Sequence, residues 1–265
     1  MKRFLKSAAI ALVLGAAGVG VAAAQQVKVG MAPEPYPPFE SPDASGTWSG
    51  WEIDFINAVC AEAKLDCVMT FTPWDGIIPA LTTKKIDVIM NSMSITEERM
   101  KEIDFSDKYY NTPTGIMGAK DQAFEATPEG LKGKILGVQV STVHAAYAKK
   151  HFAGTAAEIK EYQTQDEAQQ DLAAGRIDAV QADSISLDTY VKSDQGKACC
   201  ELKGMVAEDV EVLGPGVGAG LRKGDTELKD KINAAIKAIR ANGKYDEITK
   251  KYFDFDIYGD EAQAN

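Results

Sequence analysis

The chain has 265 residues, a formal net charge of −10 and a mean hydropathy of −0.20. Phosphate binding needs a basic face, so this acidic balance argues against nucleic acid as a partner. Beyond the first residues no apolar run has spanning length, and we expect a soluble chain with one large domain or two small ones.

Residues 1–24 are predicted to form a secretory signal peptide. Lys2, Arg3 and Lys6 precede an apolar run at residues 8–21, and three alanines at 22–24 supply the small residues of a cleavage site. An uncleaved anchor or a lipoprotein is the alternative, although no cysteine lies near the cleavage site. We therefore expect an exported, periplasmic protein.

The first part of the mature chain alternates strand and helix patterns. Apolar alternation and helical periodicity predict strands at residues 27–31, 66–71 and 87–90, and helices at residues 51–60, 76–83 and 96–101. Four prolines at residues 33–38 predict an irregular loop after the first strand. Asp75 is expected to be the N-cap of the helix that starts at Gly76.

The second part repeats this alternation. It predicts a strand at residues 114–119 that crosses to a second half, strands at 134–138, 158–162 and 178–181, and helices at 143–151 and 166–174. A glycine-rich stretch at residues 214–221 would carry the chain back. It lacks the Lys-Ser/Thr ending of a phosphate loop. Helices at 226–242 and 245–251 close the chain.

An internal repeat connects the two parts. Residues 81–92 align without gaps on residues 172–183, so that Ser92 and Asp183 end equivalent strands. The repeat predicts two similar α/β lobes, the first from residues 25–112 and 214–265, the second from residues 113–213. Strand ends of open α/β sheets are the usual ligand site, so we expect a cleft between the lobes.

Arg99 is the candidate group for a ligand carboxylate. It follows a strand-like stretch and a run of small hydroxyl residues at 92–96, and hydroxyls with a planar guanidinium suit a carboxylate. Asp183, at the matching place in the repeat, suits an ammonium group. The pair therefore predicts a zwitterionic ligand; the alternative is that both are ordinary surface charges.

The four cysteines form two pairs in sequence. Cys60 and Cys67 are seven residues apart, which in an exported protein indicates a disulfide that closes a short loop. Cys199 and Cys200 are adjacent, and a vicinal disulfide, free thiols and intermolecular pairing all remain open. Neither histidine is near a cysteine in sequence, so we expect no metal site.

Several segments in the same order resemble a known family. The segments at residues 36–40, 74–79, 92–99, 104–110 and 250–256 are similar to those of periplasmic amino-acid-binding proteins of ABC importers, solute-binding protein family 3. The resemblance covers nearly all of residues 27–259 and is closest to the lysine/arginine/ornithine and histidine group. It implies a type II periplasmic binding protein fold, with two α/β lobes joined by two crossover strands around a ligand cleft. It also implies no catalysis, no cofactor, a monomer and a membrane ABC permease as partner.

The resemblance implies how the carboxylate of an amino acid is held. Arg99 would clamp it, helped by backbone N–H groups at Ser94 and at Thr142 and Val143. The last two residues open a predicted helix, and helix N-termini favour anions.

Further roles concern the ammonium group and the side chain of the ligand. Asp183, assisted by Ser92, would hold the α-ammonium, while Trp74 and Tyr36 would sandwich the side chain, since aromatic faces also attract cations. Glu34 is the candidate acid for a side-chain amine or guanidinium. The alternatives are core positions for the two aromatic residues and a solvated loop position for Glu34.

The chain departs from the family pattern at four positions near the ligand. Pro33 stands where basic-amino-acid binders have an aspartate, in a loop one residue longer. Asn91 replaces a serine, Gln139 an apolar residue, and His144 a glutamine next to the ligand side chain. We count Asn91, Gln139 and His144 among the ligand-binding residues, with a place at the cleft rim as the alternative for His144. A larger ligand such as an opine, or a neutral one such as glutamine or histidine, stays open.

The predicted function is a receptor that binds a cationic amino acid by hinge closure and delivers it to the permease. The alternative enzyme is a periplasmic prephenate or arogenate (cyclohexadienyl) dehydratase, which would need a general acid in the cleft with a pKa raised by burial. A sensory input module is a third possibility.

Overall fold

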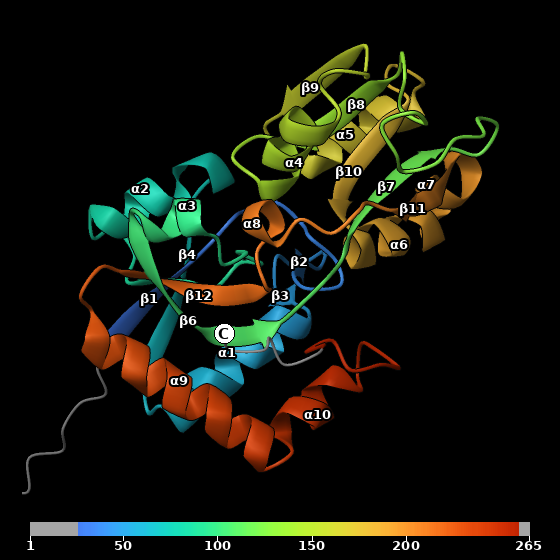
Figure 1. The fold of residues 1–265 in the computed structure, drawn as a ribbon. Helices are drawn as coiled ribbons and strands as arrows, with labels where there is room; N and C mark the ends of the chain where they lie inside the picture. The colour runs from blue at the N-terminus through green and yellow to red at the C-terminus, as the bar shows by residue number, and fades with distance from the viewer. Residues whose placement is uncertain (1–25, 260–265) are drawn as a thin grey trace, which may run out of the picture.

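The computed structural model describes residues 26–259, and the predicted signal peptide lies outside them. The chain forms two lobes, each built on a five-stranded sheet (Figure 1). The sheet of lobe 1 has the order β4-β1-β5-β12-β6. Its strands are β1 (Gln26–Met31), β4 (Asp66–Phe71), β5 (Val88–Ile89), β6 (Ile103–Tyr110) and β12 (Val217–Arg222).

The sheet of lobe 2 has the order β11-β7-β10-β8-β9. Its strands are β7 (Thr114–Ala119), β8 (Ile135–Gln139), β9 (Glu158–Tyr162), β10 (Ala179–Asp183) and β11 (Cys200–Met205). The chain passes between lobes after β6 and returns after β11 through the short helix α8 (Val210–Leu213). The expected two-lobed α/β architecture is therefore confirmed.

The two sheets repeat one topology, as the internal repeat indicated. In lobe 1, β1 lies between β4 and β5 and runs parallel to both. In lobe 2, β8 lies between β9 and β10 in the same way. Strands β12 and β7 then add antiparallel to β5 and β10. Because β5 and β10 are equivalent, the residues that follow or end them, Ser92 and Asp183, reach the same edge of their sheets.

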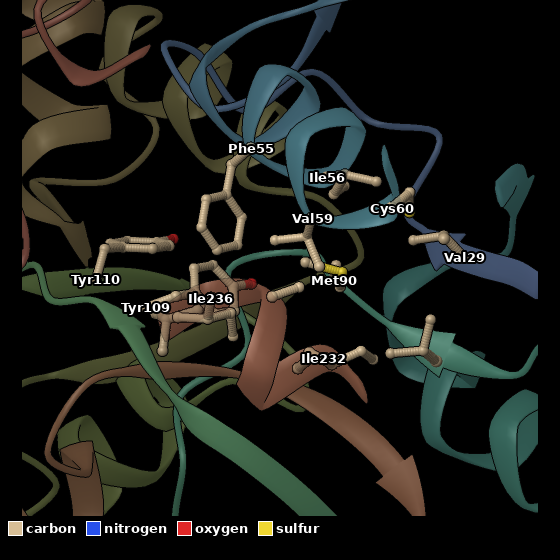
Figure 2. Close-up of a cluster of buried hydrophobic side chains, with 14 of the residues drawn as sticks. Val29, Phe55, Ile56, Val59, Cys60, Met90, Tyr109, Tyr110, Ile232 and Ile236 are labelled. Atoms are coloured by element: carbon tan, nitrogen blue, oxygen red, sulfur yellow. The ribbon is translucent and has the colours of Figure 1, made fainter. Parts of the chain in front are cut away.

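Helices cover both faces of the lobe 1 sheet. On one face lie α1 (Trp51–Glu62), α9 (Thr226–Ala241) and α10 (Lys244–Thr249). The apolar residues of α9 recur at helical spacing, and Figure 2 shows Ile232 and Ile236 facing the α1 side chains Phe55 and Val59. The other face packs against α2 (Ile77–Thr82), which follows the 3-10 turn η1 (Trp74–Gly76). The short helix α3 (Glu97–Met100) and the small hairpin of β2 (Ser41–Pro42) and β3 (Trp48–Ser49) complete this lobe.

Lobe 2 has a core on each side of its sheet. Its helices are α4 (Val143–His151), α5 (Gln165–Ala173), α6 (Ser184–Lys192) and α7 (Asp194–Cys199). Thr142 caps α4 by accepting the N–H of Ala145 at 3.1 Å, and Thr164 forms a capping box with Glu167 at the start of α5. These caps explain why the starts of both helices lie within one residue of the prediction.

Some local expectations were wrong or incomplete. Asp75 is not a helix N-cap: it lies inside η1, and α2 begins after Gly76 without a side-chain cap. The sequence assigned no element to residues 184–213, where the structure has α6, α7, β11 and α8. These are short elements of mixed polarity, so their periodicity is weak and tertiary packing decides them.

Both cysteine pairs are bonded in the structure. The predicted Cys60–Cys67 disulfide is confirmed, with Cα atoms 6.1 Å apart, and links the end of α1 to the start of β4. Cys199 and Cys200 form a vicinal disulfide between α7 and β11, one of the three open alternatives. Among residues 26–259, no helix combines the length and the apolar character that a membrane span requires.

Candidate ligand-binding cleft

A cavity of about 590 Å³, including its open mouth, lies between the two lobes. All twelve predicted ligand-binding residues line it: Glu34, Tyr36, Trp74, Asn91, Ser92, Ser94, Arg99, Gln139, Thr142, Val143, His144 and Asp183. The sequence reasoning missed four other lining residues, namely Ala32, Pro35, Glu40 and Gln165. The segment at residues 36–40, on which the resemblance rests, contains Glu40, whereas nothing in the sequence marked Gln165.

The topology explains why residues far apart in sequence meet here. The segments that line the cavity follow the carboxyl ends of the parallel strands in each sheet: the proline-rich loop follows β1, η1 follows β4, and residues 91–94 follow β5. In lobe 2, α4 follows β8, α5 follows β9, and Asp183 ends β10. Such strand ends share one edge of a sheet, and here the two edges face each other.

Arg99 is held in the cavity wall without an acidic partner. Its Nη1 donates to the Ser94 carbonyl at 2.9 Å, and its Nη2 donates to the Ser141 carbonyl of lobe 2 at 3.3 Å. Its guanidinium carbon lies 5.5 Å from the ring centre of Trp74. Burial lowers the pKa of Arg99 to about 10, which the negative charge of Asp183 opposes. The side chain therefore stays cationic at neutral pH, and no carboxylate among residues 26–259 pairs with it.

Asp183 presents a buried carboxylate from the opposite lobe. It is 8% exposed, its Oδ2 accepts the hydroxyl of Tyr36 at 2.7 Å, and its Oδ1 lies 3.5 Å from Nε2 of His144. The other ring nitrogen of His144 lies 3.3 Å from the hydroxyl of Thr114. Burial first, and then Asp183, raises the pKa of Tyr36 well above its ordinary value, so Tyr36 remains a neutral donor. His144 is buried in the cavity wall and does not occupy the cleft rim.

The mouth of the cavity carries polar groups from both lobes. Glu34 is half-buried, its Oε2 has no hydrogen-bond partner, and burial raises its pKa. The indole Nε1 of Trp74 donates to the Ser141 carbonyl at 3.3 Å, and Nε2 of Gln139 donates to the Gln163 carbonyl at 3.1 Å. The N-terminus of α4, with Thr142 as its cap, opens onto the same space and favours negative charge.

A polar network forms the deep wall of the cavity. The side chain of Asn91 accepts the N–H of Ala32 at 2.7 Å and donates to Oε1 of Glu40 at 2.6 Å. The hydroxyl of Ser92 donates to Glu52 at 3.1 Å, behind the cavity. Both amide atoms of Asn91 are thus engaged with the protein, whereas the hydroxyl oxygen of Ser92 still has lone pairs to offer a ligand.

Within residues 26–259, three hydrogen bonds cross the cleft. They join Tyr36 to Asp183, and Trp74 and Arg99 to the Ser141 carbonyl. Ser141 has a φ of 59°, in the left-handed region, just before α4. The lobes are therefore in contact across the cavity. Within the described part of the chain, no group of three or more His, Cys, Asp or Glu side chains is placed to hold a metal ion.

Comparison with known proteins agrees with this architecture. Residues 27–255 match the family model of bacterial extracellular solute-binding proteins, family 3. The chain belongs to this family. The resemblance that the sequence segments carried is thereby confirmed.

Individual relatives cover nearly the whole chain. The L-arginine-binding protein of Pseudomonas aeruginosa is 43% identical over 239 residues, which are 90% of this chain and 92% of that protein. The histidine-binding periplasmic protein of Escherichia coli is 39% identical over 98% of this chain and 100% of its own length. Among solved structures, an ancestral arginine-binding protein bound to arginine is similar with a TM-score of 0.80 and 34% identity, covering 87% of this chain and 99% of that one.

Proposed function

We propose that this family 3 solute-binding protein is the periplasmic receptor of an ABC importer, and that it binds a free cationic α-amino acid in the cleft. One observation carries the proposal: a half-buried arginine, without an acidic partner among residues 26–259, and a buried aspartate face one cavity from opposite lobes. An arginine and a carboxylate so placed match the two charges of a zwitterion.

The carboxylate of the ligand is assigned to Arg99. Its guanidinium is fixed by two carbonyl groups, so it is pre-organised to present its remaining donors. The N-terminus of α4 adds backbone N–H groups and a favourable dipole from lobe 2. The bound carboxylate therefore supplies the negative charge that Arg99 lacks among residues 26–259.

The α-ammonium of the ligand is assigned to Asp183. Its two oxygens already contact Tyr36 and His144, and a carboxylate retains lone pairs for a further donor. The hydroxyl oxygen of Ser92 is a second acceptor in the same wall.

A cationic side chain fits the remaining groups better than a neutral one. Glu34 has an unpartnered carboxylate oxygen in the cavity mouth, and the aromatic rings of Tyr36 and Trp74 line the same space. The named relatives bind arginine or histidine, which supports this choice for the present chain. Glu34 would then pair with a guanidinium, an amine or an imidazolium.

Delivery to a membrane permease follows from hinge closure. The chain crosses between the lobes twice, so that the lobes are able to rotate about two short connections. The bonds from Tyr36, Trp74 and Arg99 to lobe 2 form only when the lobes meet. A permease would distinguish the closed, loaded receptor from the open one.

The proposal includes binding without turnover. A dehydratase would need a free general acid beside its substrate. Asp183 is assigned to the ammonium and Glu34 to the side chain. Glu40, the remaining acid that lines the cavity, accepts a hydrogen bond from Asn91. When the mature protein is incubated with prephenate or arogenate, we expect neither compound to be converted. Product formation would contradict this part of the proposal.

The test is a thermal-shift screen of ligand-stripped mature protein. The compounds are the proteinogenic amino acids, ornithine, citrulline and several opines. A ligand specific for the folded state raises the melting temperature. We expect shifts with arginine, lysine, ornithine or histidine, lost in Arg99→Ala and reduced for cationic ligands alone in Glu34→Gln. Shifts confined to neutral or opine ligands would overturn the specificity, and no shift with any compound would overturn the receptor.

A further inference from the structure

Two buried carboxyl groups lie at the back of the cleft, and the ligand roles above use neither. Glu40 is 1% exposed and lines the cavity, while Glu52, at the start of α1, is completely buried behind it. Glu40 and Glu52 bind the consecutive residues Asn91 and Ser92, and the N–H of Glu52 donates to the carbonyl of Phe39, the residue before Glu40. The two carboxyl groups therefore lie close together, and the charge of Glu52 raises the pKa of Glu40. No Lys, Arg or His within residues 26–259 forms an ion pair with either group. Two buried carboxylates close together without a cation disfavour double ionisation, which favours a proton on one of them.

The hydrogen bonds show which group carries it. Glu52 accepts the N–H of Ser92 on both oxygens, at 3.1 and 2.9 Å, the hydroxyl of Ser92 at 3.1 Å, and the hydroxyl of Tyr109. The N–H of Ser92 can only donate, and it reaches both oxygens of Glu52, while the two hydroxyls are free to donate as well. This arrangement favours Glu52 as the ionised member. Glu40 receives one bond, from Asn91 at 2.6 Å, and its Oε2 has no partner. A protonated Glu40 becomes a donor to Glu52, which removes an otherwise unbalanced buried charge.

We propose that Glu40 and Glu52 share a single proton, held on Glu40. This protonated pair positions two walls of the ligand site: Ser92 on one side, and the loop that carries Glu34 on the other. The proposal rests on the receptor function inferred above. It assigns positioning roles to both residues, since Glu52 acts through Ser92, and Glu40 acts through Asn91.

The two walls depend on this pair in different ways. Ser92 has a φ of 51°, a left-handed conformation that is unfavourable for a serine, and its three bonds to Glu52 hold it there. On the other side, Asn91 connects Glu40 to the N–H of Ala32, where the loop that carries Glu34 begins. Removing the proton would place two negative charges in contact and push these walls apart.

Close approach of the backbone brings the pair together. Gly50 precedes α1 with a φ of 141°, and a Cβ at this position would lie 2.1 Å from the Phe39 carbonyl oxygen. The N–H of Glu52 donates to that same carbonyl at 2.9 Å. A glycine is therefore required for the start of α1 to press against the loop that ends in Glu40.

The surroundings keep the proton in place. Burial first, and then the charge of Glu52, raise the pKa of Glu40 well above its ordinary value. Burial also raises the pKa of Glu52, while its hydrogen bonds from Tyr109 and Ser92 oppose that change. The other titratable groups that face the pair are all acidic: Asp183 from β10, Tyr36 from the first loop, and Tyr109 and Tyr110 from β6.

The raised pKa of Glu40 sets the direction in which stability changes with pH. Because its folded-state pKa is raised, Glu40 contributes stability that is fully present below its unfolded pKa. That contribution is lost as the pH rises through the folded pKa. Ligand affinity should fall over the same interval, because the displaced walls are those that hold the ligand.

The test compares Glu40→Gln with Glu52→Gln in the full mature protein. Glutamine at position 40 reproduces a protonated glutamate, with an N–H for Glu52 and a carbonyl for Asn91. We expect Glu40→Gln to bind arginine within about threefold of wild type and to lose the alkaline fall in melting temperature. Glutamine at position 52 replaces the ionised acceptor, and we expect affinity at least about tenfold weaker, which corresponds to one or two lost hydrogen bonds.

Infrared spectroscopy of the ligand-free protein reports the proton directly and does not depend on the ligand. Wild type should show a protonated-carboxyl carbonyl band at neutral pH that is missing from Glu40→Gln. A band that persists in Glu40→Gln, or weak binding in Glu40→Gln with normal binding in Glu52→Gln, would overturn the assignment. If wild type bound no amino acid, the receptor function alone would fail, and the infrared and melting comparisons would still decide the proton.

Discussion

The hydroxyl of Tyr36 donates a 2.7 Å hydrogen bond to Oδ2 of Asp183, and these residues stand 147 positions apart on different lobes. Tyr36 belongs to the loop after β1, and Asp183 ends β10. The bond therefore forms across the cleft, at the carboxylate that we assign to the ligand ammonium. It couples closure of the lobes to the state of the binding site.

Replacing Tyr36 by phenylalanine should weaken ligand binding and leave the fold intact. The change removes one donor to a buried carboxylate but keeps the aromatic ring, so we expect a loss of about 1.5 to 3 kcal/mol, or roughly 10- to 150-fold in Kd. Isothermal titration calorimetry with arginine would measure it. Tyr190→Phe, in the other lobe and outside the cavity lining, is the matched control. Unchanged affinity in Tyr36→Phe would show that the bond does not contribute to the closed, ligand-bound state.

Replacing Arg99 by lysine should remove most of the binding although the charge is kept. Lysine lacks the planar fork that donates to the Ser94 and Ser141 carbonyls and packs beside Trp74. We expect at least about 100-fold weaker binding of every amino acid. The melting temperature of the ligand-free protein should change much less, because lysine keeps the charge and Arg99 has no acidic partner among residues 26–259 to lose. Arg176→Lys, an exposed arginine paired with Asp171, is the control. Equal losses in both variants would contradict the assignment.

Removing the Cys60–Cys67 disulfide should lower stability without changing ligand choice. The bridge closes a loop with a sequence separation of 7, and chain-entropy estimates give about 2 to 3 kcal/mol for a loop of that size. The double variant Cys60→Ala, Cys67→Ala should melt about 5 to 10 °C lower by calorimetry. A relative ranking of amino-acid affinities that changed in this variant would show that the bridge also shapes the cleft.

Asp209 should titrate well below the usual range for an aspartate. His151 and Lys150 contact its Oδ2 at 2.6 and 3.0 Å, and its Oδ1 caps α8 at Val212. Hydrogen bonds from His151 first, and then from Lys150, lower its pKa to about 2. The lowered pKa means that its contribution to stability is present above the unfolded pKa and is lost as the pH falls through the folded one.

Carboxyl NMR titration would measure this pKa. The double variant Lys150→Ala, His151→Ala should return the pKa of Asp209 toward its ordinary value of 3.8. Lys149→Ala, one position away and paired with Glu161, is the matched control and should leave it low. An Asp209 pKa that did not respond to the double variant would assign the effect to the α8 cap.

Part of the site was predictable because the strand framework that carries it is repeated in the chain. The alignment of residues 81–92 with residues 172–183 placed Ser92 and Asp183 at equivalent strand ends, and strand ends of parallel sheets meet at one edge. Helix starts with a capping hydroxyl, such as Thr142 before α4, were equally visible, since a cap is a local interaction between neighbours in sequence. Asp75 shows the limit of that reasoning, because a good capping residue one position early lies in a 3-10 turn.

Sequence reasoning alone gave the two-lobed α/β plan, the Cys60–Cys67 bridge and twelve of the sixteen residues that line the cleft. Each depends on periodicity, spacing or an ordered set of motifs, and these are properties of neighbouring positions. Only the folded structure shows that Arg99 has no acidic partner among residues 26–259 and that Glu40 lies close to Glu52. The charge state of a buried group depends on every element packed against it, and that environment exists only once β5, β6, α1 and the proline-rich loop have come together.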